Sequence, residues 1–351
     1  MKTKFRFILL EKRRRSRHER FYSMRMMPLL VLTTLLGLGS PIWAWYPTDA
    51  RDSYFPEKSP APIIGHNKYT NIDPESTLID LAYEAGLGYN SLANANPDVD
   101  PWMPSKNQDI LLPYAAIFPW QAKPGILVNT GECRLYYLWR EGKSLRIRIY
   151  PIGIGQEGWE SPSGTFFVAN KARNPTWVAP ASIRRERPDE PAVIPPGPDN
   201  PLGGYWMGLS IKGYGIHGTH KPLGVGRQVS HGCIRLYPND ISNLFPMVAV
   251  KTPVTMVYQP VKVGLWDNKL WAEIHPDDRK TGINVKDEIA RQSSRLGWKD
   301  EINWKRVQDE MNLCSGVPFV ISQGNSSHSP KTYEEEPPRP QKEKPFYEEL
   351  Y

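Results

Sequence analysis

Cysteine is scarce in this sequence, and long hydrophobic runs are missing from it. Three cysteines in 351 residues are too few for a chain held together by a disulfide framework. The longest uncharged apolar stretch, Pro28 to Gly39, has twelve residues, whereas a membrane-spanning helix needs about 20. These absences exclude a disulfide-rich scaffold and a protein with several membrane spans.

A basic excess is also absent from most of the chain, although its net charge is +7. Residues 1–25 hold ten basic and two acidic side chains, whereas the other 326 residues hold 34 basic and 35 acidic ones. A basic domain is the electrostatic signature of nucleic-acid binding. The sequence therefore excludes a globally basic body, and we expect no nucleic-acid partner.

The basic N-terminus, the short apolar stretch and the small Ala44 match the pattern of a secretory signal peptide. We expect residues 1–44 to be that signal, cleaved after Ala44, and the mature chain to lie outside the cytoplasm. An uncleaved anchor is the alternative, and the true start is either Met1 or an internal Met24 or Met26. Residues 324–351 have few apolar groups to bury, so we expect a disordered tail.

Residues 67–113 predict a small α+β module. Lys68 to Thr70 and Asp109 to Pro113 are typical of strands, and apolar residues at 78, 81, 82 and 85 recur at helical spacing before Gly86. A second helix is expected over Tyr89 to Asn94. The order is strand, helix, helix, strand.

Short runs of β-forming residues, bounded by Gly, Pro, Asn or Ser, predict a mainly β domain over residues 123–259. A proline-rich insertion, Asn174 to Leu202, interrupts it, and long insertions in compact domains are usually lids or binding loops. Between about Asp277 and Leu313 the apolar spacing is helical. We therefore expect residues 260–323 to form a helical C-terminal extension.

Three of the seven histidines and one of the three cysteines fall in one short window: His217, His220, His231 and Cys233. A thiol needs a nearby base, or a field that lowers its pKa, to become a nucleophilic thiolate, and His217 on a separate strand or loop would supply that base. Gly232 leaves the backbone free to approach a substrate carbonyl, so its N–H is a candidate for an oxyanion hole. The pattern predicts acyl transfer through a thioester.

Two other interpretations of this window stay open. Zinc takes Cys and His ligands, but neither the C-x-x-C nor the H-E-x-x-H spacing is present. A buried, inert cysteine with structural histidines is the second alternative. Glycines interleaved with polar residues argue against it, because they indicate exposed backbone. We expect no metal.

His217-Gly-Thr followed by Ser230-His-Gly-Cys-Ile-Arg-Leu236 resembles the active-site signature of the L,D-transpeptidases, which remodel bacterial peptidoglycan. Tyr150 to Gly155 and Gly158 to Thr165 also resemble this family, and residues 67–113 resemble a LysM carbohydrate-binding module. The resemblance implies a mainly β catalytic domain with an L,D-transpeptidase-like β-sandwich, and a periplasmic location. The LysM-like module either binds glycan or has only a structural role.

The resemblance also assigns roles to residues. Cys233 is the implied nucleophile and His217 the implied general base, while His231 and Gly232 shape the nucleophile loop and the amides of Gly232 and Cys233 stabilise the oxyanion. Supporting or substrate-contacting positions are Ser230, Arg235, Gly218 and Thr219, with His220 beside the site. For Arg235, a structural ion pair that holds the loop is an equal alternative to substrate binding.

The implied reaction begins when Cys233 attacks the carbonyl of the third residue of a tetrapeptide stem and releases the terminal D-Ala. An amine then resolves the thioester: another stem gives a 3–3 cross-link, and a lysine attaches an envelope lipoprotein. Water as acceptor would make the chain an L,D-carboxypeptidase, and an inert peptidoglycan-binding protein is the remaining alternative. No cofactor is implied.

The two other cysteines suggest a disulfide. Three pairings of the three cysteines are possible. We favour a bond between Cys133 and Cys314, because Cys233 must stay reduced to react and an oxidising compartment allows disulfides.

Overall fold

The computed structural model describes residues 53–55, 62–72, 75–105, 108–119, 123–142 and 144–323. All of them lie in one compact unit. The predicted signal peptide (1–44) and the predicted disordered tail (324–351) lie outside these residues. Within the described ranges, no helix combines the length and the apolar character that crossing a bilayer requires.

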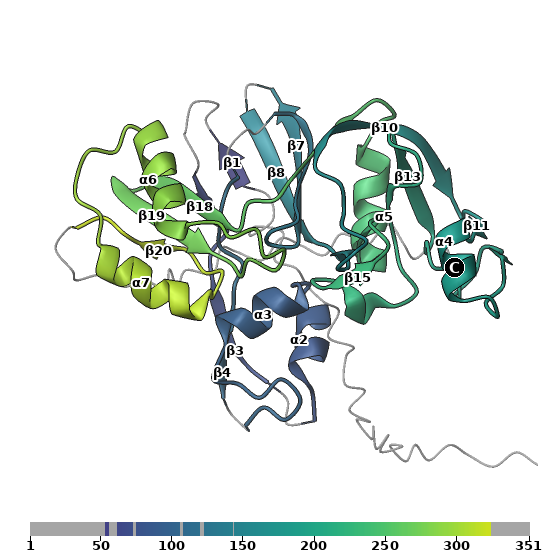
Figure 1. Ribbon diagram of the computed structural model, residues 1–351, viewed down its shortest axis with the longest axis horizontal. Coiled ribbons are helices and arrows are strands. Elements are labelled where there is room, and N and C mark those ends of the chain that lie inside the picture. The colour runs from purple at the N-terminus through teal and green to yellow at the C-terminus, as the bar shows by residue number, and fades with distance from the viewer. Residues whose placement is uncertain are drawn as a thin grey trace, which may run out of the picture. The chain divides into compact units, whose positions relative to one another are not determined.

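The module at residues 67–113 has the predicted order of elements (Figure 1). Strands β3 (Lys68–Asn71) and β4 (Asp109–Leu112) pair antiparallel, and helices α2 (Leu78–Glu84) and α3 (Tyr89–Ala95) lie between them. Helix α2 begins at a capping box, in which the Thr77 hydroxyl accepts from the backbone N–H of Asp80 and the Asp80 carboxylate accepts from that of Thr77. Apolar side chains from both helices and β4 form its core. Whether this module is a LysM domain stays a prediction.

The catalytic region is mainly β, as predicted. Nine strands form one mixed sheet in the order β1-β8-β7-β6-β17-β10-β13-β14-β16. Their bounds are β1 Ser53–Phe55, β6 Gly125–Asn129, β7 Arg134–Glu141, β8 Ser144–Pro151, β10 Gly164–Arg173, β13 Tyr205–Leu209, β14 Gly215–His217, β16 Ile234–Arg235 and β17 Pro253–Val257. The pairs β6–β17 and β14–β16 are parallel, and the other neighbours are antiparallel.

Strand β10 links the two parts of this sheet. Its first half pairs with β17 and its second half with β13, and the register shifts between Val168 and Asn170. Bulges of this kind bend a strand and let it pass from one sheet layer to another. One apolar core contains side chains from both parts of the sheet and from helix α5 (Pro238–Met247). This core supports the short strands β14 and β16 at the end of the sheet.

The predicted insertion has structure of its own. Strands β11 (Trp177–Val178) and β12 (Val193–Ile194) pair antiparallel and enclose helix α4 (Ala181–Glu186). Asn200 is fully buried at its base, where the side-chain amide donates to the carbonyl oxygens of Pro175, Ile194 and Pro195. One asparagine thus ties both ends of the insertion together.

Four short strands and one 3-10 turn complete this region. The strand pairs are β2 (Ile63–Ile64) with β5 (Ala116–Ile117) and β9 (Ile154–Gly155) with β15 (Gln228–Ser230), and a 3-10 turn, η1, spans Pro222–Gly224. The turn between α2 and α3 packs on the segment that leads to the site. The Tyr237 hydroxyl donates to Leu87 O at 2.9 Å. A Cβ on Gly88 would stand 2.9 Å from the Cα of Gly226, so this contact needs glycine.

The C-terminal region is α+β, so the prediction that residues 260–323 are helical throughout is wrong. The helical spacing predicted between about Asp277 and Leu313 is confirmed. Helices α6 (Val285–Arg295) and α7 (Trp304–Leu313) lie within residues 277–313. They pack on a three-stranded antiparallel sheet of β18 (Val261–Trp266), β19 (Lys269–Ile274) and β20 (Phe319–Val320). Asp267 and Asn268 join β18 to β19 and both have positive φ, which is the geometry of a tight hairpin turn.

The predicted disulfide between Cys133 and Cys314 is not formed, and all three cysteines are free thiols. Cys133 is part of the core of the catalytic region, whereas Cys314 packs against the separate core of the C-terminal sheet, where its thiol donates to Met311 O. Because the two cysteines pack in different cores, they do not form the predicted disulfide. Burial raises the pKa of Cys133 to about 12, so its thiol is inert.

Candidate active site

The parallel pair β14–β16 places the main site residues on one face. Ile216 is opposite Ile234, and His217 is opposite Arg235. Both isoleucines are fully buried in the core. Because alternate residues of a strand project to opposite faces, His217, Arg235 and Cys233 share the face away from that core. The strand pairing thus brings the His217 segment next to the segment that follows Cys233.

His217 is held as a neutral base. Its ring is 3% exposed, and Nδ1 lies 2.6 Å from the carbonyl oxygen of Gly218. A carbonyl oxygen only accepts hydrogen bonds, so Nδ1 bears the proton and Nε2 keeps a lone pair. The Trp206 ring stacks on the imidazole at 5.7 Å. Burial, with Arg235 nearby, lowers the pKa of His217 to about 3, so the ring is neutral at physiological pH and its Nε2 lone pair is unprotonated.

Cys233 is a thiol in the resting enzyme. Its Sγ donates to Gly213 O at 3.6 Å. Burial raises the pKa of the thiol, while the backbone N–H of Gly215 and the charge of Arg235 act in the opposite direction. A protonated thiol on the same face as a neutral imidazole would need that imidazole as base to become a nucleophile. This arrangement supports the predicted nucleophile and base.

The loop that ends at Cys233 depends on Ser230 and Gly232. The Ser230 hydroxyl donates to Cys233 O at 2.6 Å and accepts from Gly232 N at 3.1 Å. Gly232 has φ +95°, and a Cβ there would stand 2.5 Å from the ring of Tyr214. Since its N–H is bonded to Ser230, the Gly232 amide is not free for the oxyanion role expected of it. The Gly215 N–H already bonds the Cys233 sulfur, so the Cys233 amide remains the candidate.

His231 faces the insertion and is not paired with the catalytic residues. Its Nε2 lies 2.7 Å from the Glu186 carboxylate of α4, and the Trp159 ring lies 5.0 Å away on a neighbouring loop. The hydrogen bond to His231 lowers the pKa of Glu186. His231 therefore joins the nucleophile loop to the insertion.

The other end of the insertion contacts the segment after the base. Gly203 has φ +62°, and a Cβ there would stand 2.9 Å from Thr219 N and 3.2 Å from the Cα of Gly218. Thr219 is buried, and its hydroxyl accepts from Lys221 N at 3.0 Å. The insertion thus contacts the strand end that bears His217 and also the loop that bears Cys233.

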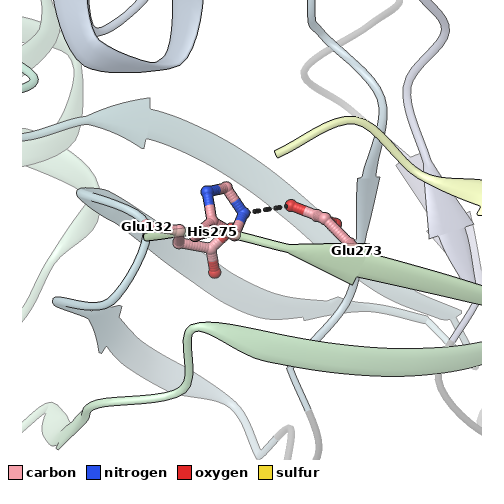
Figure 2. Close-up of side chains that lie close together, drawn as sticks. All are labelled: Glu132, Glu273 and His275. Carbon is pink, nitrogen blue, oxygen red and sulfur yellow. Dashed lines mark hydrogen bonds and ion pairs between the residues drawn. The ribbon is translucent and has the colours of Figure 1, made fainter. Parts of the chain in front are cut away.

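A group with metal-ligand geometry exists elsewhere, at the end of β19 and in the turn before β7 (Figure 2). Glu132, Glu273 and His275 are all buried, and His275 Nε2 lies 2.7 Å from Glu273 Oε1. Arg134 and Lys262, however, contact both carboxylates at 2.6 to 3.0 Å. Two cations already neutralise two anions, and they would repel a divalent ion. We interpret the group as an ion-pair network.

The zinc alternative gains no support around Cys233. In the part of the chain that the structure describes, no metal-like group includes Cys233, His217, His220 or His231. The ring nitrogens that make contacts are His217 Nδ1, on a carbonyl, and His231 Nε2, on a carboxylate.

Sequence reasoning missed Trp206, Glu186 and Trp159, which contact the two site histidines. Glu186 and Trp159 lie in loops or in the insertion, where no periodicity signals a contact. Trp206 lies directly opposite His217 on β13, but that pairing was visible only once the register was known.

Comparison with known proteins indicates the family of the chain. The family model of the L,D-transpeptidase catalytic domain, YkuD, matches residues 123–256. The probable L,D-transpeptidase ErfK/SrfK of Salmonella typhimurium is 36% identical over 264 residues, which are 70% of this chain and 83% of that protein. The probable L,D-transpeptidase YcfS of Escherichia coli is 36% identical over 276 residues, covering 74% and 85%.

Among solved structures, the catalytic domain of the E. faecium L,D-transpeptidase aligns with 26% identity and a TM-score of 0.31, covering 39% of this chain and 99% of that one. The family assignment does not depend on it. It follows from the two relatives, of which this chain covers more than four-fifths. The chain belongs to the L,D-transpeptidase family.

Proposed function

We propose that the chain is an exported, periplasmic enzyme whose Cys233 is acylated by a tetrapeptide stem of peptidoglycan. The observation that supports this most directly is the fixed tautomer of His217, whose Nδ1 donates to Gly218 O. In the first step His217 Nε2 accepts the Cys233 proton, and Sγ attacks the carbonyl of the third stem residue. The bond to D-Ala breaks, and the imidazolium returns its proton to the leaving amine.

The second step transfers the acyl group to an amine. His217 Nε2 accepts a proton from the acceptor amine, the new amide forms, and Cys233 leaves and regains its proton as a thiol. The acceptor is either the side-chain amine of a second stem, which gives a 3–3 cross-link, or a lysine of an envelope lipoprotein. The chain's own residues account for each proton, so this mechanism uses no cofactor.

Hydrolysis is the second candidate, because water in place of the amine would give an L,D-carboxypeptidase. The insertion favours transfer to an amine, since it contacts the segments on both sides of the cleft and a covered cleft limits access of water to the thioester. An inert peptidoglycan-binding protein fits less well. A buried neutral imidazole on the same face as a thiol has no evident purpose in a binding protein.

We also propose that the module at residues 67–113 binds glycan. Trp102 and Met103 are 65% and 80% exposed on the loop between α3 and β4. Exposed aromatic rings bury large apolar areas on binding, and a sugar face offers such a surface. A Trp102→Ala variant should lose binding to purified sacculi, whereas an exposed-aromatic control in the C-terminal region, Trp304→Ala, should keep it. If both variants bind sacculi equally well, Trp102 does not contribute to glycan binding.

The central test uses the purified mature chain with a tetrapeptide donor and defined acceptors. Mass spectrometry should show release of D-Ala and a product joined to the amine acceptor, and Cys233→Ala should show neither. Tripeptide without joined product would instead identify a carboxypeptidase. Muropeptide analysis of cells with and without the gene then separates 3–3 cross-links from lipoprotein attachment.

A further inference from the structure

Arg235 is a largely buried cation without an acidic partner among the described residues. It lies two residues after Cys233 and opposite His217. Its Nε is buried and makes no hydrogen bond. The charged groups that act on it most strongly are the Cys233 thiol and Arg187, and neither is a carboxylate. A buried guanidinium without a counter-ion is costly to retain.

A second unsatisfied group lies close by. His220 Nδ1 is also buried without a hydrogen bond. The charge of Arg235 contributes to lowering the pKa of both His220 and His217, which agrees with the short spacing of these three side chains. More than about nine in ten buried polar groups in proteins have a hydrogen-bond partner. Two exceptions beside the reacting residues indicate that their partner comes with a ligand.

Asp199 and Glu190 of the insertion act electrostatically on His220. Among the described residues, however, no hydrogen bond or ion pair joins an acid of the insertion to Arg235 or His220. Glu186 bonds to His231, and Glu190 bonds to Arg187 at 3.2 Å. The structure therefore disfavours the structural ion pair that was an equal alternative for Arg235. A group that satisfies a guanidinium and an imidazole together must be an anion with more than one acceptor oxygen.

We propose that Arg235, with His220 beside it, binds a carboxylate of the donor stem during acylation. This inference rests on the proposed function, because it concerns the substrate of the same site. A donor whose third residue is a diamino acid with a side-chain carboxylate has two such groups near the scissile bond. One is the C-terminal carboxylate of the leaving D-Ala, and the other belongs to the third residue. Either contact would hold the scissile carbonyl against Cys233 Sγ.

The test measures donor affinity by calorimetry with the Cys233→Ala chain and with Cys233→Ala combined with Arg235→Gln. Three tetrapeptides are compared: both carboxylates free, the C-terminal one as carboxamide, and the side-chain one as carboxamide. One amidation should weaken binding to Cys233→Ala by roughly 10- to 100-fold, as expected for a lost charge-assisted hydrogen bond. The double variant should bind all three peptides equally weakly. The carboxylate whose amidation weakens binding to Cys233→Ala is the one that Arg235 contacts.

Arg146→Gln, at a partly exposed ion pair with Glu141, is the matched control and should keep the discrimination. Equal binding of all three peptides by Cys233→Ala, or discrimination that survives Arg235→Gln, would overturn the inference, as would absence of any binding. Turnover of the unmodified donor by the wild-type chain tests the proposed function separately. If the wild-type chain turns over the donor but Cys233→Ala binds all three peptides equally, only the carboxylate-binding inference fails. If the peptides bind with different affinities but the donor is not turned over, only the proposed function fails.

Discussion

The pairing of Cys233 with His217 is that of a neutral thiol and a neutral imidazole. Burial keeps both side chains uncharged, because it lowers the pKa of His217 to about 3 and raises the pKa of Cys233. A carbapenem is a suitable acylating probe. Its rate constant with Cys233 should stay nearly constant between about pH 5 and pH 8, because neither group titrates there. Stopped-flow measurements that show an inflection near pH 6.5 would contradict this assignment.

Gly232 has a conformation and surroundings that exclude a side chain. Gly232→Ala should reduce acylation of Cys233 by about 100-fold or more, because displacing a nucleophile by about 1 Å has that effect and the new Cβ meets the Tyr214 ring. Gly142→Ala is the matched control, since Gly142 also has positive φ but nothing within 4 Å. It should lose stability only. Equal acylation rates for the two variants would show that the loop tolerates displacement.

At the scale of elements, helix α4 of the insertion is held to the nucleophile loop through Glu186 and His231. Glu186→Ala should increase amide hydrogen exchange in residues 181–186 and raise the acylation rate several-fold, because the cleft opens more often. Glu190→Ala removes a carboxylate from the same insertion without touching His231. It should change neither quantity. Unchanged exchange in Glu186→Ala would mean that this hydrogen bond does not hold the helix.

The strands and helices differed in how well the sequence predicted them. Residues 78–95 were predictable because apolar spacing, a capping box and Gly86 all favour the same two helices. The hairpin at residues 261–274 was missed, although Asp267 and Asn268 are typical turn residues. Val261, Lys262 and Val263 do alternate between apolar and charged side chains, so a strand signal was present, but Lys262 is buried in ion pairs and does not face solvent.

For the whole molecule, the buried network around Glu273 connects three regions of the chain. Its carboxylate accepts from Ile117 N of β5 and pairs with Arg134 of β7 and Lys262 of β18. Lys262 is the cross-strand partner of Glu273 in the β18–β19 hairpin. Ile117 and Arg134 are more than 100 residues from Glu273, so no short-range pattern predicts those two contacts. A compact motif sufficed to predict Cys233 and His217 as the reacting residues, which stays a prediction, whereas no pattern indicated the strands of the C-terminal region or its attachment through Glu273.

Glu273→Gln should destabilise the fold by about 3–5 kcal/mol, because it leaves two buried cations with one carboxylate. Its cationic neighbours Lys262 and Arg134 hold the pKa of Glu273 well below its usual range, against the effect of burial. The stabilisation is therefore present above the unfolded pKa of about 4.3 and is lost as pH falls below it. Thermal unfolding at pH 7 and at pH 3 checks both statements.

Glu141→Gln, in the exposed pair with Arg146, should have little effect on the unfolding temperature. A Glu273→Gln chain as stable as this control at pH 7 would show that the network contributes nothing net.

The account as a whole depends on a thioester at Cys233. Intact-mass spectrometry of the purified chain, quenched in acid after brief mixing with a tetrapeptide donor, measures it directly. We expect a mass gain equal to the donor without D-Ala, located on Cys233 by peptide mapping and absent from Cys233→Ala. D-Ala release that persists in Cys233→Ala, or an adduct on another residue, would contradict the account.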